Sequence, residues 1–185
     1  MGTLRIVAGR LRGRRLRVAH DAALRPTSDR VREALFNILG QDLSGTDVLD
    51  LYAGTGALGF EAISRGARTA VFVEASPRIA IALRQSAKDL GVEHEARVIV
   101  GRVDDVLTRE RLGGSFDVVF ADPPYEDHAY AALVARIDAG GILSPGGTMV
   151  TEREAKTRPD LAPGPLALVR TERYGRTALD FFKYR

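Results

Sequence analysis

Residues 47–59 read DVLDLYAGTGALG, and this stretch decides the fold. Its first half is the short apolar run of a buried strand, and its glycines lead directly into an apolar helical pattern over residues 57–65. A strand that passes through a glycine turn into a helix predicts a ligand loop at the carboxyl edge of an open α/β sheet. Gly54 and Gly56 allow the backbone to approach a ligand closely, and the helix N-terminus offers free N–H groups.

Strands and helices continue to alternate downstream of this loop. Strands are predicted over residues 69–74, 97–100, 116–121 and 147–152, and helices over residues 77–90, 104–112 and 127–139. Two late strands, 166–173 and 177–183, have no helix between them and predict an antiparallel hairpin. The fold class is therefore α/β, a doubly wound, Rossmann-like and mostly parallel sheet with a C-terminal antiparallel hairpin.

The N-terminal part forms a basic extension to this sheet. Short strands are predicted over residues 4–7 and 16–18, and a helix over 29–39 that begins at Ser28 or Asp29 and ends at Gly40. Residues 1–34 hold nine arginines against three acidic residues, a net charge of +6, whereas the whole chain carries only +3. This asymmetry indicates either a nucleic-acid binder or a solvated, arginine-rich surface.

Composition narrows the chemistry that the protein can perform. With 185 residues, 45% hydrophobic and 28% charged, the chain is predicted to form one globular domain with a small appendage. It has no cysteine, which excludes disulfides, thiolate zinc sites, cysteine-held iron–sulfur clusters and the cysteine nucleophile of cytosine-C5 methylation. The three histidines are scattered, so no metal site is expected. No apolar run approaches a membrane span or a signal peptide, and we expect a cytoplasmic protein.

Acidic residues at the predicted strand ends suggest a ligand for the glycine loop. A lone G-x-G is compatible with a nicotinamide-dependent oxidoreductase. However, Asp50 is unsuited to a pyrophosphate and well suited to the ammonium group of a methionine moiety. Glu74 closes the next strand, where an acid accepts the hydroxyls of a ribose in either a dinucleotide or S-adenosylmethionine. Near an adenine, the backbone of Arg102 and Val103 and the acids at positions 104 and 105 remain alternatives.

The tetrapeptide Asp122-Pro123-Pro124-Tyr125 follows the apolar strand FDVVFA directly. Two successive prolines stiffen the turn and remove two N–H donors, which leaves carbonyl oxygens and the Asp122 carboxylate as acceptors. These acceptors can hold the two hydrogens of an exocyclic amine while its lone pair points at a methyl group. Tyr125 offers a ring on which a splayed-out base can stack. The alternative interpretation is a strand-end turn with an incidental aromatic residue.

Together these motifs resemble class I methyltransferases that act on amino nitrogens. The N-terminal block RPTSDRVREALFN, residues 25–37, is more selective and resembles the RsmD family of 16S rRNA guanine-N2 methyltransferases. The resemblance implies S-adenosylmethionine as cofactor and a guanine of 16S rRNA in the small ribosomal subunit as substrate. It also implies an RNA-facing extension over residues 1–40 beside a methyltransferase domain over residues 41–185. Separately, we expect no metal and a monomer.

The expected site residues divide into three sets. The catalytic set is Asp122, Pro123, Pro124 and Tyr125. The cofactor set is Asp50, Tyr52, Ala53, Gly54, Thr55, Gly56, Glu74, Ala75, Arg102 and Val103. The RNA-binding set is Arg10, Arg12, Arg14, Arg15, Arg25, Arg30 and Arg32, which are expected to be exposed and to contact phosphates.

The main alternative keeps the enzyme class and changes the acceptor to adenine N6 in DNA or RNA, because the Asp-Pro-Pro-Tyr motif is shared with such enzymes. A glutamine-amide acceptor fits less well, since those enzymes usually carry asparagine where Asp122 stands. A nicotinamide-dependent oxidoreductase is disfavoured by Asp50 and by the motif. A catalytically silent RNA-binding protein on the same scaffold is disfavoured by the intact acids.

Overall fold

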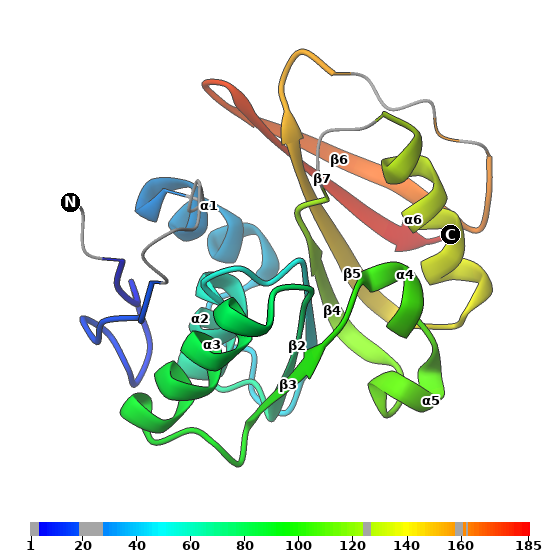
Figure 1. Cartoon of the computed structure of the whole chain (residues 1–185). Helices are drawn as coiled ribbons and strands as arrows, with labels where there is room; N and C mark the ends of the chain where they lie inside the picture. The colour runs from blue at the N-terminus through cyan, green and yellow to red at the C-terminus, as the bar shows by residue number, and fades with distance from the viewer. Residues whose placement is uncertain (1–3, 19–27, 124–126, 158–160, 162) are drawn as a thin grey trace.

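The computed structural model describes residues 4–18, 28–123, 127–157, 161 and 163–185. Within them, one twisted sheet runs in the order β3-β2-β1-β4-β5-β7-β6 (Figure 1). Its strands are β1 (Asp47–Leu51), β2 (Thr69–Glu74), β3 (Ala96–Val100), β4 (Phe116–Ala121), β5 (Leu143–Glu154), β6 (Leu166–Tyr174) and β7 (Thr177–Tyr184). Strands β1 to β5 pair in parallel, and β7 pairs antiparallel with both β5 and β6. The predicted fold class is confirmed.

Helices cover both faces of the sheet, as Figure 1 shows. Helices α1 (Asp29–Leu39), α2 (Ala57–Ser64) and α3 (Pro77–Leu90) pack on one face, in a core that includes Phe72 and Phe120. Helices α4 (Val103–Val106), α5 (Arg109–Leu112) and α6 (Asp127–Ala139) lie over the other face, where Leu49 and Val119 are buried. None of the described helices is long and apolar enough to cross a membrane.

Local signals explain where the long helices begin and end. The Ser28 hydroxyl accepts the N–H of Val31 and so caps α1. Ser76 caps α3 in the same way before its first-turn proline, and Gly91 ends that helix in the left-handed conformation. The region predicted as one helix over 104–112 is instead two short helices, α4 and α5. Thr108 separates them because its side chain caps α5 by accepting the N–H of Arg111.

The N-terminal hairpin is present, but its pairing is shorter than the sequence predicts. Residues 4–7 and 16–18 do not form strands; a single bridge joins Arg5 and Arg15. Across the hairpin, the Ile6 N–H donates to the carbonyl of Arg14 and the Leu16 N–H to that of Leu4, each at 3.0 Å. The pairing goes no further because the N–H groups of Val7 and Ala8 are accepted by the carboxylate of Glu61 in α2, at 2.8 and 2.9 Å. The segment is consequently fixed to the body of the protein.

Burial confirms that this segment belongs to the main core. Leu4, Ile6, Leu11 and Leu16 are buried in the same cluster as the residues of α1 and α2. Gly9 lies so close to α2 that a Cβ atom there would stand 2.0 Å from the carbonyl oxygen of Ser64. Residues 4–18 therefore pack as part of the globular body rather than as a detached arm.

Candidate active site at the carboxyl edge of the sheet

Four acidic residues stand at the carboxyl edge, on the adjacent strands β2, β1, β4 and β5. Each acid comes two residues after a core residue on the face of the sheet that α1 to α3 cover. In the order of the strands just given, these core residues are Phe72, Val48, Phe120 and Val150. Because alternate residues of a strand face the same side, the four acids extend this row beyond the core. They are Asp50, Glu74, Asp122 and Glu152. Glu152 is a site residue that the sequence did not reveal.

Two of these acids hold the glycine loop in place. Asp50 is buried and accepts the N–H of Gly59 at 3.0 Å. Glu74 accepts the N–H of Gly54 at 3.0 Å through one oxygen and that of Ser76 at 2.8 Å through the other. Glu74 thus joins the loop after β1 to the loop after β2. Each of its oxygens retains acceptor capacity for a hydroxyl group.

The loop backbone is shaped for close approach of a ligand. Tyr52 has a φ of 58°, a left-handed conformation that costs free energy in a non-glycine residue and is typical of ligand sites. Gly56 begins α2 at a φ of 73°, and a Cβ atom there would lie 2.6 Å from Leu83 and 2.8 Å from Phe60. The turn before α2 can therefore pack this closely against Leu83 and Phe60 only because position 56 is glycine.

The acids also influence one another's ionisation. Burial raises the pKa of Asp50 to about 8, and the charges of Asp122 and Glu74 add to this effect, whereas the Gly59 N–H opposes it. Asp122 is an exposed residue, but the protein around its carboxyl removes part of the hydration of the charged form. This desolvation, followed by the charge of Glu152, raises the pKa of Asp122 to about 7. Such a concentration of carboxylates favours a cationic ligand.

S-adenosylmethionine fits this edge. It carries a sulfonium and an ammonium group, which the row of acids can neutralise, and a ribose whose hydroxyls can donate to Glu74. In the third-strand loop, Val103 is buried and begins α4, while the Asp104 carboxylate accepts Arg136 of α6 at 2.6 Å. Asp104 is thereby directed toward α6, and the backbone of Arg102 and Val103 remains the adenine-side candidate. Tyr52 lies near this loop, since the Asp104 charge contributes, after burial, to its raised pKa.

The catalytic set lies partly outside the described residues. Asp122 and buried Pro123 follow the end of β4. Pro124 and Tyr125 fall outside the described residues, so their expected roles remain predictions. The motif is followed at once by α6, whose first turns carry Tyr130.

A buried polar network underlies this part of the site, and the sequence did not indicate it. The hydroxyl of Tyr130 donates to Asp180 of β7 at 2.7 Å and also bonds Thr151 of β5. Asp180 is fully buried and further accepts Arg153 at 2.5 Å and Thr171 at 2.6 Å. The network joins α6 to β5, β6 and β7. In the sequence, the only sign that the Asp180 side chain is buried is that apolar residues lie on either side of it.

The predicted RNA-binding arginines differ in their surroundings. The side chains of Arg12, Arg15 and Arg30 are exposed. Those of Arg10 and Arg14 are exposed but bond Glu95 and the carbonyl of Asp89, respectively. Arg25 lies outside the described residues. A basic pocket of about 400 Å³ is lined by Arg5, Gly13, Arg15 and Asp29.

The structure corrects the predicted role of Arg32. It was expected among the exposed arginines, but its side chain is 1% exposed. Its guanidinium donates to the carbonyl of Arg5 at 2.7 Å and to Asp29 at 2.8 Å, so it joins α1 to the N-terminal segment. Burial lowers the pKa of Arg32, partly offset by the charge of Asp29. It has a packing role and is not available to RNA phosphates.

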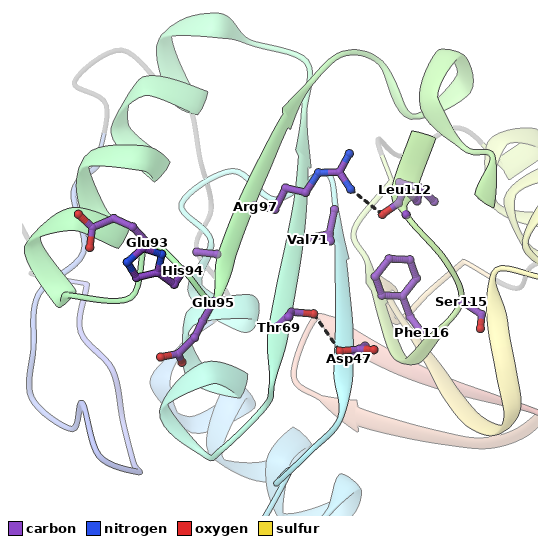
Figure 2. Close-up of a pocket in the computed structure, with 12 residues that line it drawn as sticks. Asp47, Thr69, Val71, Glu93, His94, Glu95, Arg97, Leu112, Ser115 and Phe116 are labelled. Carbon is purple, nitrogen blue, oxygen red and sulfur yellow. Dashed lines mark hydrogen bonds between the residues drawn. The ribbon is translucent and has the colours of Figure 1, made fainter. Parts of the chain in front are cut away.

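A second pocket, of about 300 Å³, opens at the opposite edge of the sheet, where the parallel strands begin (Figure 2). Asp47 there accepts the Thr69 hydroxyl at 2.9 Å, and Arg97 donates to the carbonyl of Leu112 at 3.1 Å. These contacts tie strands and loops together. The pocket is remote from the row of acids and belongs to a separate part of the surface.

The strand order, the glycine loop and the acidic carboxyl edge, together with the relatives given below, define a class I, S-adenosylmethionine-dependent methyltransferase. An RNA methyltransferase from Salinibacter ruber, solved with S-adenosyl-L-homocysteine, shares this fold at a TM-score of 0.66 and 21% identity, covering 86% of this chain and 93% of its own. The chain belongs to the family described as Conserved hypothetical protein 95, the RsmD family, which matches residues 4–183.

Individual relatives cover almost the whole chain. Ribosomal RNA small subunit methyltransferase D of Haemophilus influenzae is 34% identical over 94% of this chain and 90% of its own length. Its Escherichia coli counterpart is 32% identical over 98% of this chain and 90% of its own. The solved yhhF protein of Escherichia coli superposes with a TM-score of 0.87 at 30% identity, covering 100% of this chain and 99% of its own.

Proposed function

We propose that the protein transfers the methyl group of S-adenosylmethionine to the exocyclic N2 of a guanine in 16S rRNA of the small ribosomal subunit. The observation that carries the proposal is the position of Asp122 and Pro123 beside the glycine loop, at the carboxyl end of β4. The RsmD-family relatives, whose names state action on ribosomal RNA of the small subunit, support the choice of acceptor.

The cofactor supplies an electrophilic methyl group on a positively charged sulfur. Asp122 and the carbonyl of Pro123 then accept the two N2 hydrogens and hold the nitrogen with its lone pair toward that methyl group. Position in line accounts for most of the acceleration, since the sulfonium methyl group is already electrophilic and needs little activation. A new N–C bond forms as the C–S bond breaks, and N2 loses a proton. With its pKa near 7, Asp122 is suited to take that proton at neutral pH.

The N-terminal segment supplies the proposed RNA surface. Arg12, Arg15 and Arg30 present exposed guanidinium groups on the same segment and helix that pack beside α2. Phosphate contacts from such residues orient RNA without reading its sequence. In this proposal residues 1–40 hold the RNA, and residues 41–185 carry the cofactor and the chemistry.

The test uses tritiated S-adenosylmethionine and three separate substrates: 30S subunits from a methylation-deficient strain, naked 16S rRNA and duplex DNA. Nucleosides are separated after digestion. Label in N2-methylguanosine from ribosomal RNA supports the proposal, whereas label in N6-methyladenosine, or on DNA alone, contradicts it. D122N is expected to reduce transfer by about 10²- to 10⁴-fold while S-adenosylhomocysteine binds with little change, because the carboxylate acts on the acceptor.

A further inference from the structure

We propose that Glu152 recognises the N1–H of the target base and thereby selects guanine over adenine. This inference rests on the proposed methylation of guanine N2. It assigns a specificity-determining role to a residue of β5 that neither the glycine loop nor the Asp-Pro-Pro-Tyr motif includes.

The sheet places Glu152 directly beside the catalytic motif. Strands β4 and β5 lie side by side and pair in parallel, with Ala121 opposite Thr151 (Figure 1). Asp122 directly follows Ala121 and Glu152 directly follows Thr151, so the two acids are neighbours where β4 ends, and paired strands lie about 4.8 Å apart. The charge of Glu152 contributes to the raised pKa of Asp122, which agrees with this proximity.

The strand that carries Glu152 is held firmly on both sides. Its neighbours Thr151 and Arg153 face the opposite side of the sheet and bond the buried Tyr130–Asp180 network. On the β7 side, Glu152 is paired with Leu179. The Glu152 side chain is half-buried and belongs to the face that also carries Asp50 and Asp122. A carboxylate on a strand fixed in this way is preorganised for directional recognition.

Two neighbouring carboxylates oppose each other electrostatically, so the pair favours a ligand rich in N–H donors. Guanine presents three such donors along one edge, N1–H and the two hydrogens of N2. The site offers three matching acceptors, namely Asp122, the carbonyl of Pro123 and Glu152. Adenine has only the two hydrogens of N6, and the ring nitrogen beside them, N1, is an acceptor. A carboxylate at position 152 would face a lone pair on adenine.

Glu152 also favours the proposed reaction itself. Accepting the N1–H increases electron density in the guanine ring, which makes the N2 lone pair more nucleophilic. The proton lost from N2 goes to Asp122, and Glu152 keeps its hydrogen bond to N1–H throughout. Its role is therefore to fix the identity and orientation of the base, while Asp122 contacts the reacting nitrogen.

The decisive variants are E152Q and E152A, with E154Q as the matched control. Glu154 lies two residues further along the same strand and is exposed. All are assayed on 30S subunits for kcat/KM and for the ratio of N6-methyladenosine to N2-methylguanosine by mass spectrometry. Calorimetry with S-adenosylhomocysteine confirms that each variant is folded and retains its cofactor site. We expect E152A to lower kcat/KM about 10- to 100-fold, as for a lost charge-assisted hydrogen bond.

E152Q provides the sharper readout, because its amide can accept from guanine N1–H or donate to adenine N1. We expect it to raise the adenine-to-guanine product ratio at least about tenfold over wild type, with E154Q unchanged. Unchanged kcat/KM and product ratio in both Glu152 variants would overturn the inference. Absence of N2-methylguanosine from wild-type reactions would instead overturn the proposed function, so the two failures are distinguishable.

Discussion

The ionisation of Asp122 in the cofactor-free protein can be predicted in detail. Aspartate ordinarily titrates near 3.8, and desolvation, followed by the charge of Glu152, raises the pKa of Asp122 to about 7. E152Q retains the size of the side chain and removes its charge. Since desolvation is the larger cause, we expect E152Q to lower the midpoint by on the order of one pH unit and leave it above the ordinary value.

Carboxyl ¹³C NMR across pH 4–10 measures this midpoint directly. Two aspartates should titrate late, Asp122 near 7 and Asp50 near 8, and D122N and D50N should each remove one of them. E154Q should leave both unchanged. An Asp122 midpoint near 4 in wild type would refute the reasoning, as would an E152Q midpoint that moves upward.

The same ionisation predicts how cofactor binding and stability depend on pH. A cationic cofactor favours the ionised acids, so its affinity should rise as pH increases through the range from about 6 to 8, with release of protons on binding. Folding, in contrast, favours protonated Asp50, whose pKa is raised in the native state. That contribution is complete below pH 3.8 and is lost as pH rises through about 8. D50N should therefore be more stable than wild type at pH 9, measured by urea denaturation.

Three further variants test how the site is held. E61A removes the buried carboxylate that accepts the N–H groups of Val7 and Ala8 and pairs with Arg65. It should lower the free energy of unfolding in urea by about 3–5 kcal/mol. G56A should weaken S-adenosylhomocysteine binding in calorimetry at least about tenfold, because its Cβ meets Leu83. The control G91A has the same φ of 73° and no atom within 4 Å of its Cβ, and should leave binding unchanged. Y130F removes a hydroxyl from buried Asp180 and should cost about 1–3 kcal/mol in thermal unfolding; a change below about 0.5 kcal/mol would contradict the assigned network.

The fold could be predicted from sequence because its signals are local. The apolar runs ending at Leu51, Glu74 and Ala121 are bounded by glycine, serine or proline, and each gives a strand within one residue of its predicted limits. The cap at Ser28 and the closing Gly91 were equally readable. Such boundaries depend on a few neighbouring residues, and the tertiary structure did not alter them.

The predictions that failed depend on residues far apart in the chain. How far the N-terminal hairpin extends is decided by Glu61, 54 positions away from Val7. Whether Arg32 is exposed is decided by the carbonyl of Arg5 and the packing of α1 against the N-terminal segment. The sequence does not distinguish Glu152 from other glutamates in strands, and only the β4–β5 register places it beside Asp122. No local pattern contains this information.

The row of acids also predicts a change in cofactor affinity during the proposed reaction. Asp50 and Asp122 retain protons up to unusually high pH, because desolvation disfavours their charged forms and the charges of neighbouring carboxylates add to this effect. Bound S-adenosylmethionine would bring two positive charges to these acids, the sulfonium and the ammonium, besides its own carboxylate. After the transfer the sulfur is neutral, and the acids face one positive charge. The electrostatic attraction at this edge is therefore strongest before the reaction and weaker after it, which favours release of the product.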